Sequence, residues 1–269
     1  MRNTQRQFLS DSTDKISGRI VLIVAGGDLA NIVINRFTDS FSELVVLREL
    51  PETKVAVIRR RWRLLGPWQA FSQVAAGALT RILGRLSKLR LDRICSQYSL
   101  DRSDNGAVQI IEVPSVNSDE CREALRRLSP AVVAVYGTRI IGSTTLACVN
   151  VPFINYHAGI NPKYRGQHPA YWALVNNDKI NAGVTIHLVD EGVDTGSIIV
   201  QARVAFETSD NISTYQFVQM AVALPLFISA MEAALQKRIE VRESGLESKQ
   251  WFPPTLEQYT FNGLTKGVW

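Results

Sequence analysis

The sequence predicts an α/β fold with a mostly parallel sheet, an antiparallel β extension and a C-terminal helix. An apolar run from Arg19 to Ala25 ends in Gly26-Gly27, as a buried parallel strand entering a tight turn does. Strand-like and helix-like segments then alternate, which is typical of a parallel sheet covered by helices. Beyond residue 154, two β-rich runs follow each other directly. The expected architecture is therefore Rossmann-like.

The alternating elements can be placed on the chain from apolar spacing and capping residues. In order, the expected elements are a helix from Asp28, strands at 44–47 and 54–58, a strand at 108–113, a helix at 119–128 capped by Ser118, and a strand at 131–136. The β extension consists of runs at 183–189 and 197–204 that are joined by a loop at 190–196, which predicts an antiparallel pair with a functional loop.

A long helix from about 212 to 236 is expected to close the core. Residues 211–231 carry no charge, but polar residues and Pro225 interrupt them, so a buried helix is favoured over a transmembrane segment. We expect residues 1–18 to form a mobile leader, 19–237 a catalytic domain, and 238–269 a wrapping tail.

Residues 59–93 form the most basic part of the chain. They hold nine Lys and Arg against one acid, Asp92, which gives +8; the total of +5 leaves −3 for the rest. Helical periodicity interrupted by Gly66-Pro67 and Gly84 predicts two or three basic amphipathic helices here. Such a stretch either binds a phosphate-bearing group or an anionic membrane surface, or is a solvated helical face.

The composition is that of an ordinary globular protein, with 46% hydrophobic and 20% charged residues. The three cysteines, Cys95, Cys121 and Cys148, show no disulfide or zinc-binding pattern, and the N-terminus lacks the apolar run of a secretory signal. These features predict a cytoplasmic protein without a transmembrane segment.

Three polar residues near the ends of predicted strands suggest chemistry. Asn155 and His157 follow a short apolar strand, at the sheet edge where open α/β folds bind ligands, and in an extended segment they point the same way. Together they can donate hydrogen bonds to an oxygen that becomes negative during attack on a carbonyl. Asp194 can orient the imidazole or accept a proton. His168 and His187 lie nearby in sequence, but the histidine spacing matches no familiar zinc motif, so no metal is expected.

The same region carries a dense family resemblance. Its motifs are Asn155-Tyr-His157, Asn161-Pro-Lys-Tyr-Arg-Gly166, Gly183-Val-Thr185 and Asp190-Glu-Gly-Val-Asp194-Thr-Gly196. In this order they resemble the formyltransferase superfamily, which uses 10-formyltetrahydrofolate as co-substrate. The resemblance implies that Asn155 and His157 bind the formyl oxygen and that Asp194 supports His157 and proton transfer.

The resemblance also implies two binding sets. The folate set comprises Arg139, Ile140 and Ile141 in the segment that cradles the pterin, and Asp190, Glu191, Gly192 and Val193 in the loop that closes over it. The substrate set, around the amine, comprises Tyr164, Arg165, Gly166 and His168.

The amine acceptor is less constrained by the sequence. Asp28 follows Gly26-Gly27 where glycinamide ribonucleotide formyltransferases have a phosphate loop, and a carboxylate there competes with phosphate. Methionyl-tRNA formyltransferases carry a larger C-terminal domain, and a formyltetrahydrofolate hydrolase an additional N-terminal one. We therefore expect a small-molecule amine, such as a nucleotide-linked amino sugar, and no nucleic acid.

Two alternatives belong to other classes of protein. One is a non-catalytic folate-binding protein. The other, a nicotinamide oxidoreductase, is disfavoured because Gly26-Gly27-Asp28 lacks the GxGxxG spacing.

Overall fold

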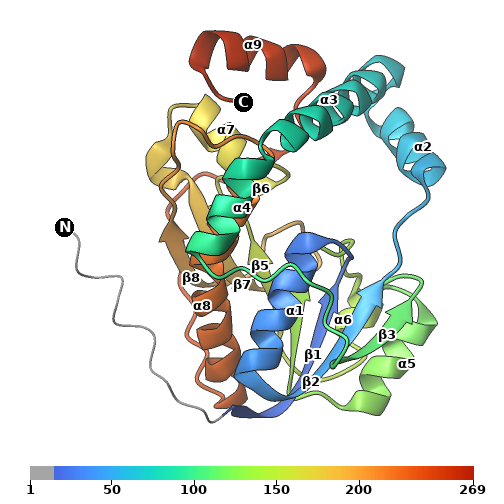
Figure 1. The fold of residues 1–269 in the computed structure, drawn as a ribbon. Helices are drawn as coiled ribbons and strands as arrows, with labels where there is room; N and C mark the ends of the chain where they lie inside the picture. The colour runs from blue at the N-terminus through green and yellow to red at the C-terminus, as the bar shows by residue number, and fades with distance from the viewer. Residues whose placement is uncertain (1–14) are drawn as a thin grey trace.

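A computed structural model describes residues 15–269, and its centre is a seven-stranded sheet (Figure 1). The strand order is β3-β2-β1-β4-β5-β7-β8. Its strands are β1 (Ile16–Val24), β2 (Phe41–Glu49), β3 (Gln109–Val113), β4 (Val132–Tyr136), β5 (Phe153–His157), β7 (Gly183–Leu188) and β8 (Ile198–Arg203). Neighbours are parallel from β3 to β5, and β7 and β8 are antiparallel. The predicted fold class is confirmed.

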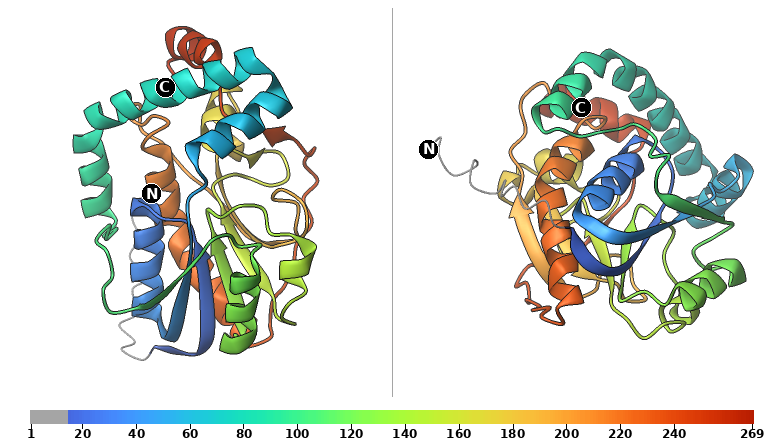
Figure 2. Two further views of the ribbon diagram at one scale, coloured as in Figure 1. Left: turned by 90° about the vertical axis from the view of Figure 1, so that its right-hand side faces the viewer. Right: turned by 60° about the horizontal axis from the view of Figure 1, so that its bottom comes forward.

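Helices cover both faces of this sheet (Figure 2). On one face lie α1 (Asp28–Ser40) and α8 (Tyr215–Leu235), and on the other lies α5 (Asp119–Leu128). Strand β1 shows why two layers form: Ile20 and Leu22 pack with α1 and α8, whereas Val21 and Ile23 pack with α5. Successive strand residues point to opposite faces, so a continuous apolar run requires a cover on each side.

Helix α8 is the predicted closing helix. By length and composition it is apolar enough to span a membrane. Core helices pass the same test, and half of the apolar window of α8 is buried inside the protein. Its Gln219 is buried and donates hydrogen bonds to the carbonyls of Ala158 (2.6 Å) and Gly183 (2.8 Å). These bonds tie α8 to the sheet, as a core helix requires.

The basic stretch forms helices, as predicted, but with different limits. They are α2 (Lys54–Leu65), α3 (Pro67–Leu86) and α4 (Lys88–Gln97). The expected strand at 54–58 is wrong: Thr53 caps α2 by accepting from the amide of Ala56, and β3 already occupies the edge of the sheet beside β2. Gly84 does not interrupt α3, and the break falls at Ser87.

The C-terminal part returns to the middle of the chain. Its β9 (Gln250–Trp251) pairs with β6 (Arg165–Gly166), and α9 (Leu256–Lys266) packs against α3. The remaining short helices are α6 (Ser143–Leu146), α7 (Pro169–Val175) and the 3-10 turn η1 (Lys179–Asn181). Trp251 stacks on Tyr164 and Trp172, with ring centroids 5.7 and 4.9 Å apart. Residues 238–269 thereby hold the segment that precedes α7. Residues 1–14 of the expected leader lie outside the described residues.

Candidate active site

Asn155 and His157 lie on β5 and line one cavity of about 510 Å³. The cavity lies at the carboxyl end of β4, where the loop 137–141 begins, and the loop 190–194 forms another wall. Residues 250–252 also line it. The parallel strands β4 and β5 therefore bring their ends to a single pocket, as the sequence suggested for this sheet edge.

His157 is held from both sides of its ring. Its Nε2 lies 2.7 Å from the carbonyl oxygen of Tyr164, which can only accept, so Nε2 carries the proton. Nδ1 faces Oδ2 of Asp194 at 3.4 Å. Burial lowers the pKa of His157 below its usual 6.5, although Asp194 and the Tyr164 carbonyl act in the opposite direction. A neutral ring with an unprotonated Nδ1 follows, and any proton that reaches Nδ1 is stabilised by Asp194.

Asp194 is a half-buried carboxylate that stays ionised. Burial alone would raise its pKa, but the charge that His157 carries when protonated, the neighbouring His187 ring and the hydrogen bond from the amide of Gly166 lower the pKa to about 2. The Gly166 amide donates to Oδ2 at 2.9 Å. The backbone of Asp194 is left-handed, with φ of 52°, a conformation that Asp tolerates better than most residues.

His187 completes the polar cluster from the neighbouring strand β7. Its Nδ1 donates to the carbonyl of Leu188 at 2.7 Å, so its Nε2 accepts from Nδ2 of Asn155 at 3.0 Å. Nε2 also lies 3.7 Å from Oδ1 of Asp194. The antiparallel register opposes Asn155 to His187, which places this hydrogen-bonded sheet residue beside the amide. One Asn155 N–H is thereby used, and the other is available to the cavity.

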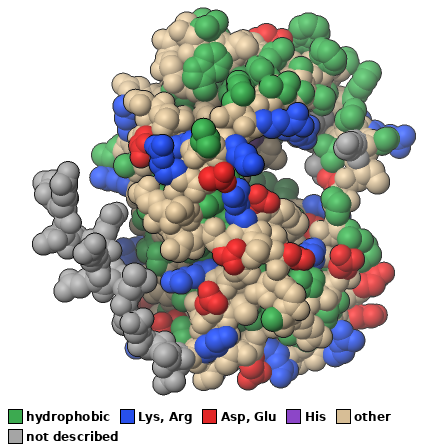
Figure 3. Space-filling model, in the orientation of Figure 1, with side chains coloured by type: hydrophobic (Ala, Val, Ile, Leu, Met, Phe, Trp, Pro, Cys, Tyr) green, Lys and Arg blue, Asp and Glu red, His purple; other side chains and the backbone are tan. Residues whose placement is uncertain are grey.

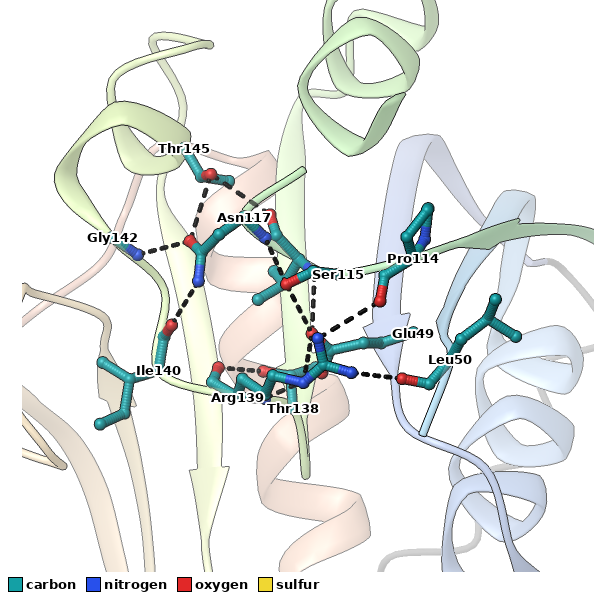
Figure 4. Close-up of polar contacts among 11 residues, drawn as sticks. Glu49, Leu50, Pro114, Ser115, Asn117, Thr138, Arg139, Ile140, Gly142 and Thr145 are labelled. Atoms are coloured by element: carbon teal, nitrogen blue, oxygen red, sulfur yellow. Dashed lines mark hydrogen bonds and ion pairs between the residues drawn. The ribbon is translucent and has the colours of Figure 1, made fainter. Parts of the chain in front are cut away.

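The loop 137–141 is positioned by Glu49, at the end of β2 (Figure 4). The Glu49 carboxylate is buried and accepts from the backbone amides of Arg139 (2.9 Å) and Val116 (2.7 Å). It also pairs with Nε of Arg139 at 3.5 Å. Sequence reasoning missed Glu49, because nothing near it in the chain signals a partner ninety residues away.

Asn117 fixes the far end of the same loop (Figure 4). Its side-chain amide donates to the carbonyl of Ile140 at 2.8 Å, and its Oδ1 accepts from the amide of Gly142 at 2.7 Å. The guanidinium of Arg139 is itself engaged with backbone carbonyls of Leu50 and Pro114. Arg139 therefore acts on the loop's shape, while the loop backbone and Ile140 line the cavity.

The structure brings most of the predicted binding residues to this cavity. Those that line it are Arg139, Ile140, Ile141, Asp190, Gly192, Val193, Gly166 and His168. Glu191 is not among the lining residues. Tyr164 is buried, and contributes its carbonyl to His157 and its ring to the Trp251 stack. Arg165 donates to the carbonyl of Val193 at 2.7 Å and so braces the 190–194 loop.

A second cavity of about 390 Å³ adjoins the first through Gln167 and His168, which line both. Its other walls come from Glu52, α2, α3, Ile212 and Pro253-Pro254, and they combine apolar side chains with the polar Glu52, Gln73, Thr80 and Arg81. Figure 3 shows the molecular surface hollowed between the α2 arm and the body. Within residues 15–269, no three His, Cys, Asp or Glu side chains form a cluster suited to a metal ion.

Part of the chain is similar to a known protein family. Residues 92–221 match the model of the formyl transferase family, a stretch that runs from α4 into α8 and includes Asn155, His157 and Asp194. The resemblance to formyltransferases that the motifs predicted is confirmed. The helices α2 and α3 lie outside the matched stretch.

Curated relatives named methionyl-tRNA formyltransferase match part of the chain. Over 110 residues, the chain is 39% identical to methionyl-tRNA formyltransferase of Pelotomaculum thermopropionicum, covering 40% of this chain and 34% of the relative. The first curated relatives are matched over only 34% to 38% of their length.

Two solved structures share the fold. Phosphoribosylglycinamide formyltransferase of Anaplasma phagocytophilum superposes with a TM-score of 0.55 at 16% identity, over 90% of this chain and all of that one. The sugar 3N-formyl transferase WlaRD, solved in the presence of dTDP and 5-N-formyl-THF, gives 0.51 at 16% identity, over 87% and 69%.

Proposed function

We propose that this chain is an N-formyltransferase that uses 10-formyltetrahydrofolate to formylate a primary amine of a small molecule. The observation that carries this proposal is the convergence of Asn155, His157 and Asp194 on one cavity, within a segment that matches the formyl transferase family. Each of these residues is common at strand ends and turns. A catalytic site requires such groups to meet at one place, and here the ionised carboxylate of Asp194 also lies beside the imidazole of His157.

The first cavity is our candidate site for the folate. Its 510 Å³ is within the range of small-molecule sites, and its lining combines apolar residues such as Ile141 and Val189 with residues of the loops 137–141 and 190–194. We assign these loops to the pterin. The sugar 3N-formyl transferase crystallised with 5-N-formyl-THF supports a folate site on this fold. When bound, 10-formyltetrahydrofolate supplies the formyl group in a form that an amine can attack.

The side chains then have distinct roles. The remaining N–H of Asn155 stabilises an oxygen on which negative charge develops. Nδ1 of His157 is an unprotonated base in the cavity wall, and it takes a proton from the attacking amine. Asp194 stabilises the imidazolium that results, because its Oδ2 faces the protonated atom. As the new bond between the amine and the formyl carbon forms, the bond from that carbon to N10 of the folate would break, and the proton held by His157 would pass to N10 of the departing tetrahydrofolate. His187 orients the Asn155 amide.

The second cavity is our candidate site for the amine. It meets the first cavity at His168, which would bring an amine bound there close to His157. Arg81 is a cation suited to a phosphate, so a nucleotide-linked amino sugar is the acceptor that we favour. Glycinamide ribonucleotide and methionyl-tRNA are the competing acceptors that the relatives suggest.

We place the protein in a reducing compartment, the cytoplasm. Cys95, Cys121 and Cys148 are all free. Burial raises the pKa of the Cys121 thiol to about 12, so this thiol is inert at neutral pH.

The direct test is an assay of tetrahydrofolate release and product mass with 10-formyltetrahydrofolate and a panel of amines. The panel contains free and nucleotide-linked amino sugars, glycinamide ribonucleotide and methionyl-tRNA. We expect one nucleotide-linked amino sugar to be formylated. Release without any formylated amine would identify a hydrolase instead.

Folate binding is tested separately, by calorimetry and thermal unfolding with 5-formyltetrahydrofolate. A ligand that prefers the native state raises the melting temperature by mass action. Binding without turnover on any acceptor favours a non-catalytic folate-binding protein, and the absence of both heat and a thermal shift removes the folate assignment.

A further inference from the structure

Helices α2 and α3 form a hairpin whose tip exposes large aromatic side chains. Trp62 is 58% exposed, Trp68 is 71% exposed and Phe71 is 68% exposed. Trp62 precedes and Trp68 follows the turn at Gly66, so both indoles lie at the tip. Figure 1 shows this tip at the upper right, away from the sheet. Exposed aromatic side chains that gather in this way mark an interaction surface.

Both helices also expose apolar side chains beyond the tip. On α2, Val55, Ile58 and Trp62 recur at helical spacing and line a shallow groove with Arg59 and Arg63. On α3, the exposed apolar side chains include Ile82 and Leu86 as well as Trp68 and Phe71. Figure 3 shows hydrophobic side chains gathered over α3 and α9 at the top right.

The charges on the same helices have one sign. Arg59 and Arg63 are exposed on α2, and Arg81 and Arg85 on α3. The single acid between residues 59 and 93, Asp92, is paired with Arg102 at 2.7 Å. The hairpin therefore combines exposed indoles with exposed arginines and has no acidic residue in its own sequence, which is the chemistry of a helix that lies at an anionic lipid interface.

We propose that the α2–α3 hairpin docks this protein on the surface of an anionic lipid bilayer. A second copy of the chain is disfavoured, because a symmetric contact through this face would bring like charges together. Anionic headgroups complement the arginines, while Trp62, Trp68 and Phe71 enter the boundary between headgroups and acyl chains.

Docking would also bear on the active site. Ile58 lines both the outer groove of α2 and the second cavity, so one helix joins the proposed lipid contact to the proposed amine site. This consequence rests on the proposed function. The docking itself does not, because it can be measured without turnover.

The test is co-sedimentation of the full chain with vesicles of phosphatidylcholine, with and without phosphatidylglycerol. We expect binding only to the anionic vesicles, and a steep loss with added salt. Arg59→Gln with Arg63→Gln should lower the partition ratio by roughly fivefold per arginine. The matched control is Arg126→Gln with Arg127→Gln on α5, two exposed arginines remote from the hairpin, which should bind like the wild type.

A second set of variants tests the aromatic contact. Trp62→Ser, Trp68→Ser and Phe71→Ser together should abolish binding, whereas Ile180→Ser with Val241→Ser, two exposed apolar residues elsewhere, should not. Melting temperatures equal to the wild type establish folding. In the wild type, brominated lipids should quench tryptophan fluorescence, and Trp62→Phe with Trp68→Phe should bind but lose this quenching.

Three results would overturn the proposal. The first is wild-type protein that stays in the supernatant with anionic vesicles at low salt. The second is equal sedimentation of the hairpin variants and their controls. The third is a dimer in light scattering that the triple serine variant dissociates, because a second copy would then cover this face.

Discussion

Oδ2 of Asp194 lies 3.4 Å from Nδ1 of His157, while the other ring nitrogen of His157 is held by the Tyr164 carbonyl. Because of these two contacts, Nδ1 is the ring nitrogen that can gain a proton. Because the carboxylate stays ionised and burial keeps the imidazole neutral, the pair is set to accept a proton from a neutral nucleophile.

The first prediction concerns the three proposed catalytic residues. His157→Ala, Asn155→Ala and Asp194→Ala should each lower kcat on the order of a hundredfold or more, since each removes a group that acts on developing charge. Steady-state kinetics on the identified amine measures this, with circular dichroism as the folding check. A folded His157→Ala protein with wild-type turnover contradicts the mechanism.

The second prediction concerns pH. Protonated His157 cannot accept a proton, so kcat/KM should rise with pH through the His157 pKa, which lies below 6.5. Asp194 favours the protonated ring, and Asp194→Asn should therefore move the acid limb to lower pH. The titration of the amine is common to all variants, so the shift between them isolates His157. Asp39→Asn, which changes an exposed carboxylate on α1, should leave the limb in place.

The third prediction concerns Glu49. In Glu49→Gln, one carboxylate oxygen becomes an NH₂ group that cannot accept, so the hydrogen bond from either the Val116 amide or the Arg139 amide is lost. The free energy of unfolding should fall by about 1.5–3 kcal/mol, and the affinity for 5-formyltetrahydrofolate on the order of tenfold. Denaturant titration and calorimetry measure the two effects. Glu43→Gln changes a surface ion pair and should alter either by little; equal effects of both substitutions contradict the role of Glu49.

The fourth prediction concerns Gly166, which joins the active site to the C-terminal segment. Its φ is +89°, and an added Cβ would lie 2.3 Å from the carbonyl oxygen of Trp251. Gly166→Ala should therefore separate β6 from β9, weaken the amide contact to Asp194 and destabilise the fold by at least roughly 2 kcal/mol. Gly245→Ala is the control, because a Cβ there meets nothing within 4 Å. An equal free energy of unfolding for the two variants would show that the β6–β9 pairing does not stabilise the fold.

The fifth prediction separates Arg81 from its neighbour on α3. Arg81 lines the second cavity, whereas Arg85 is exposed and does not. For an acceptor that carries a phosphate, Arg81→Gln should raise KM by roughly tenfold through the loss of a charge-assisted hydrogen bond, with kcat nearly unchanged. Arg85→Gln should leave KM unchanged. An equal KM for both variants removes phosphate recognition from this cavity.

Features that depend on short-range pattern could be predicted from the sequence alone. The apolar run before Gly26-Gly27 specified a central strand, and Ser118 specified the start of α5, where its side chain accepts from the amide of Cys121. The spacing of Asn155 and His157 put both side chains in one cavity, because alternate residues of a strand share a face. Such features need no knowledge of which segments pair.

Contacts between segments that are distant in the chain could not be predicted in this way, because they depend on the tertiary structure. His187 meets Asn155 through the antiparallel register of β5 and β7, and a shift by one residue would turn it to the other face. Glu49 reaches Arg139 because β2 and the loop after β4 end at the same edge of the sheet. Residues 54–58 have the β-branched composition of a strand but are helical, since β3 fills the place beside β2. Pairing and register depend on the geometry of the whole sheet, and local periodicity carries no information on which strand edge remains free.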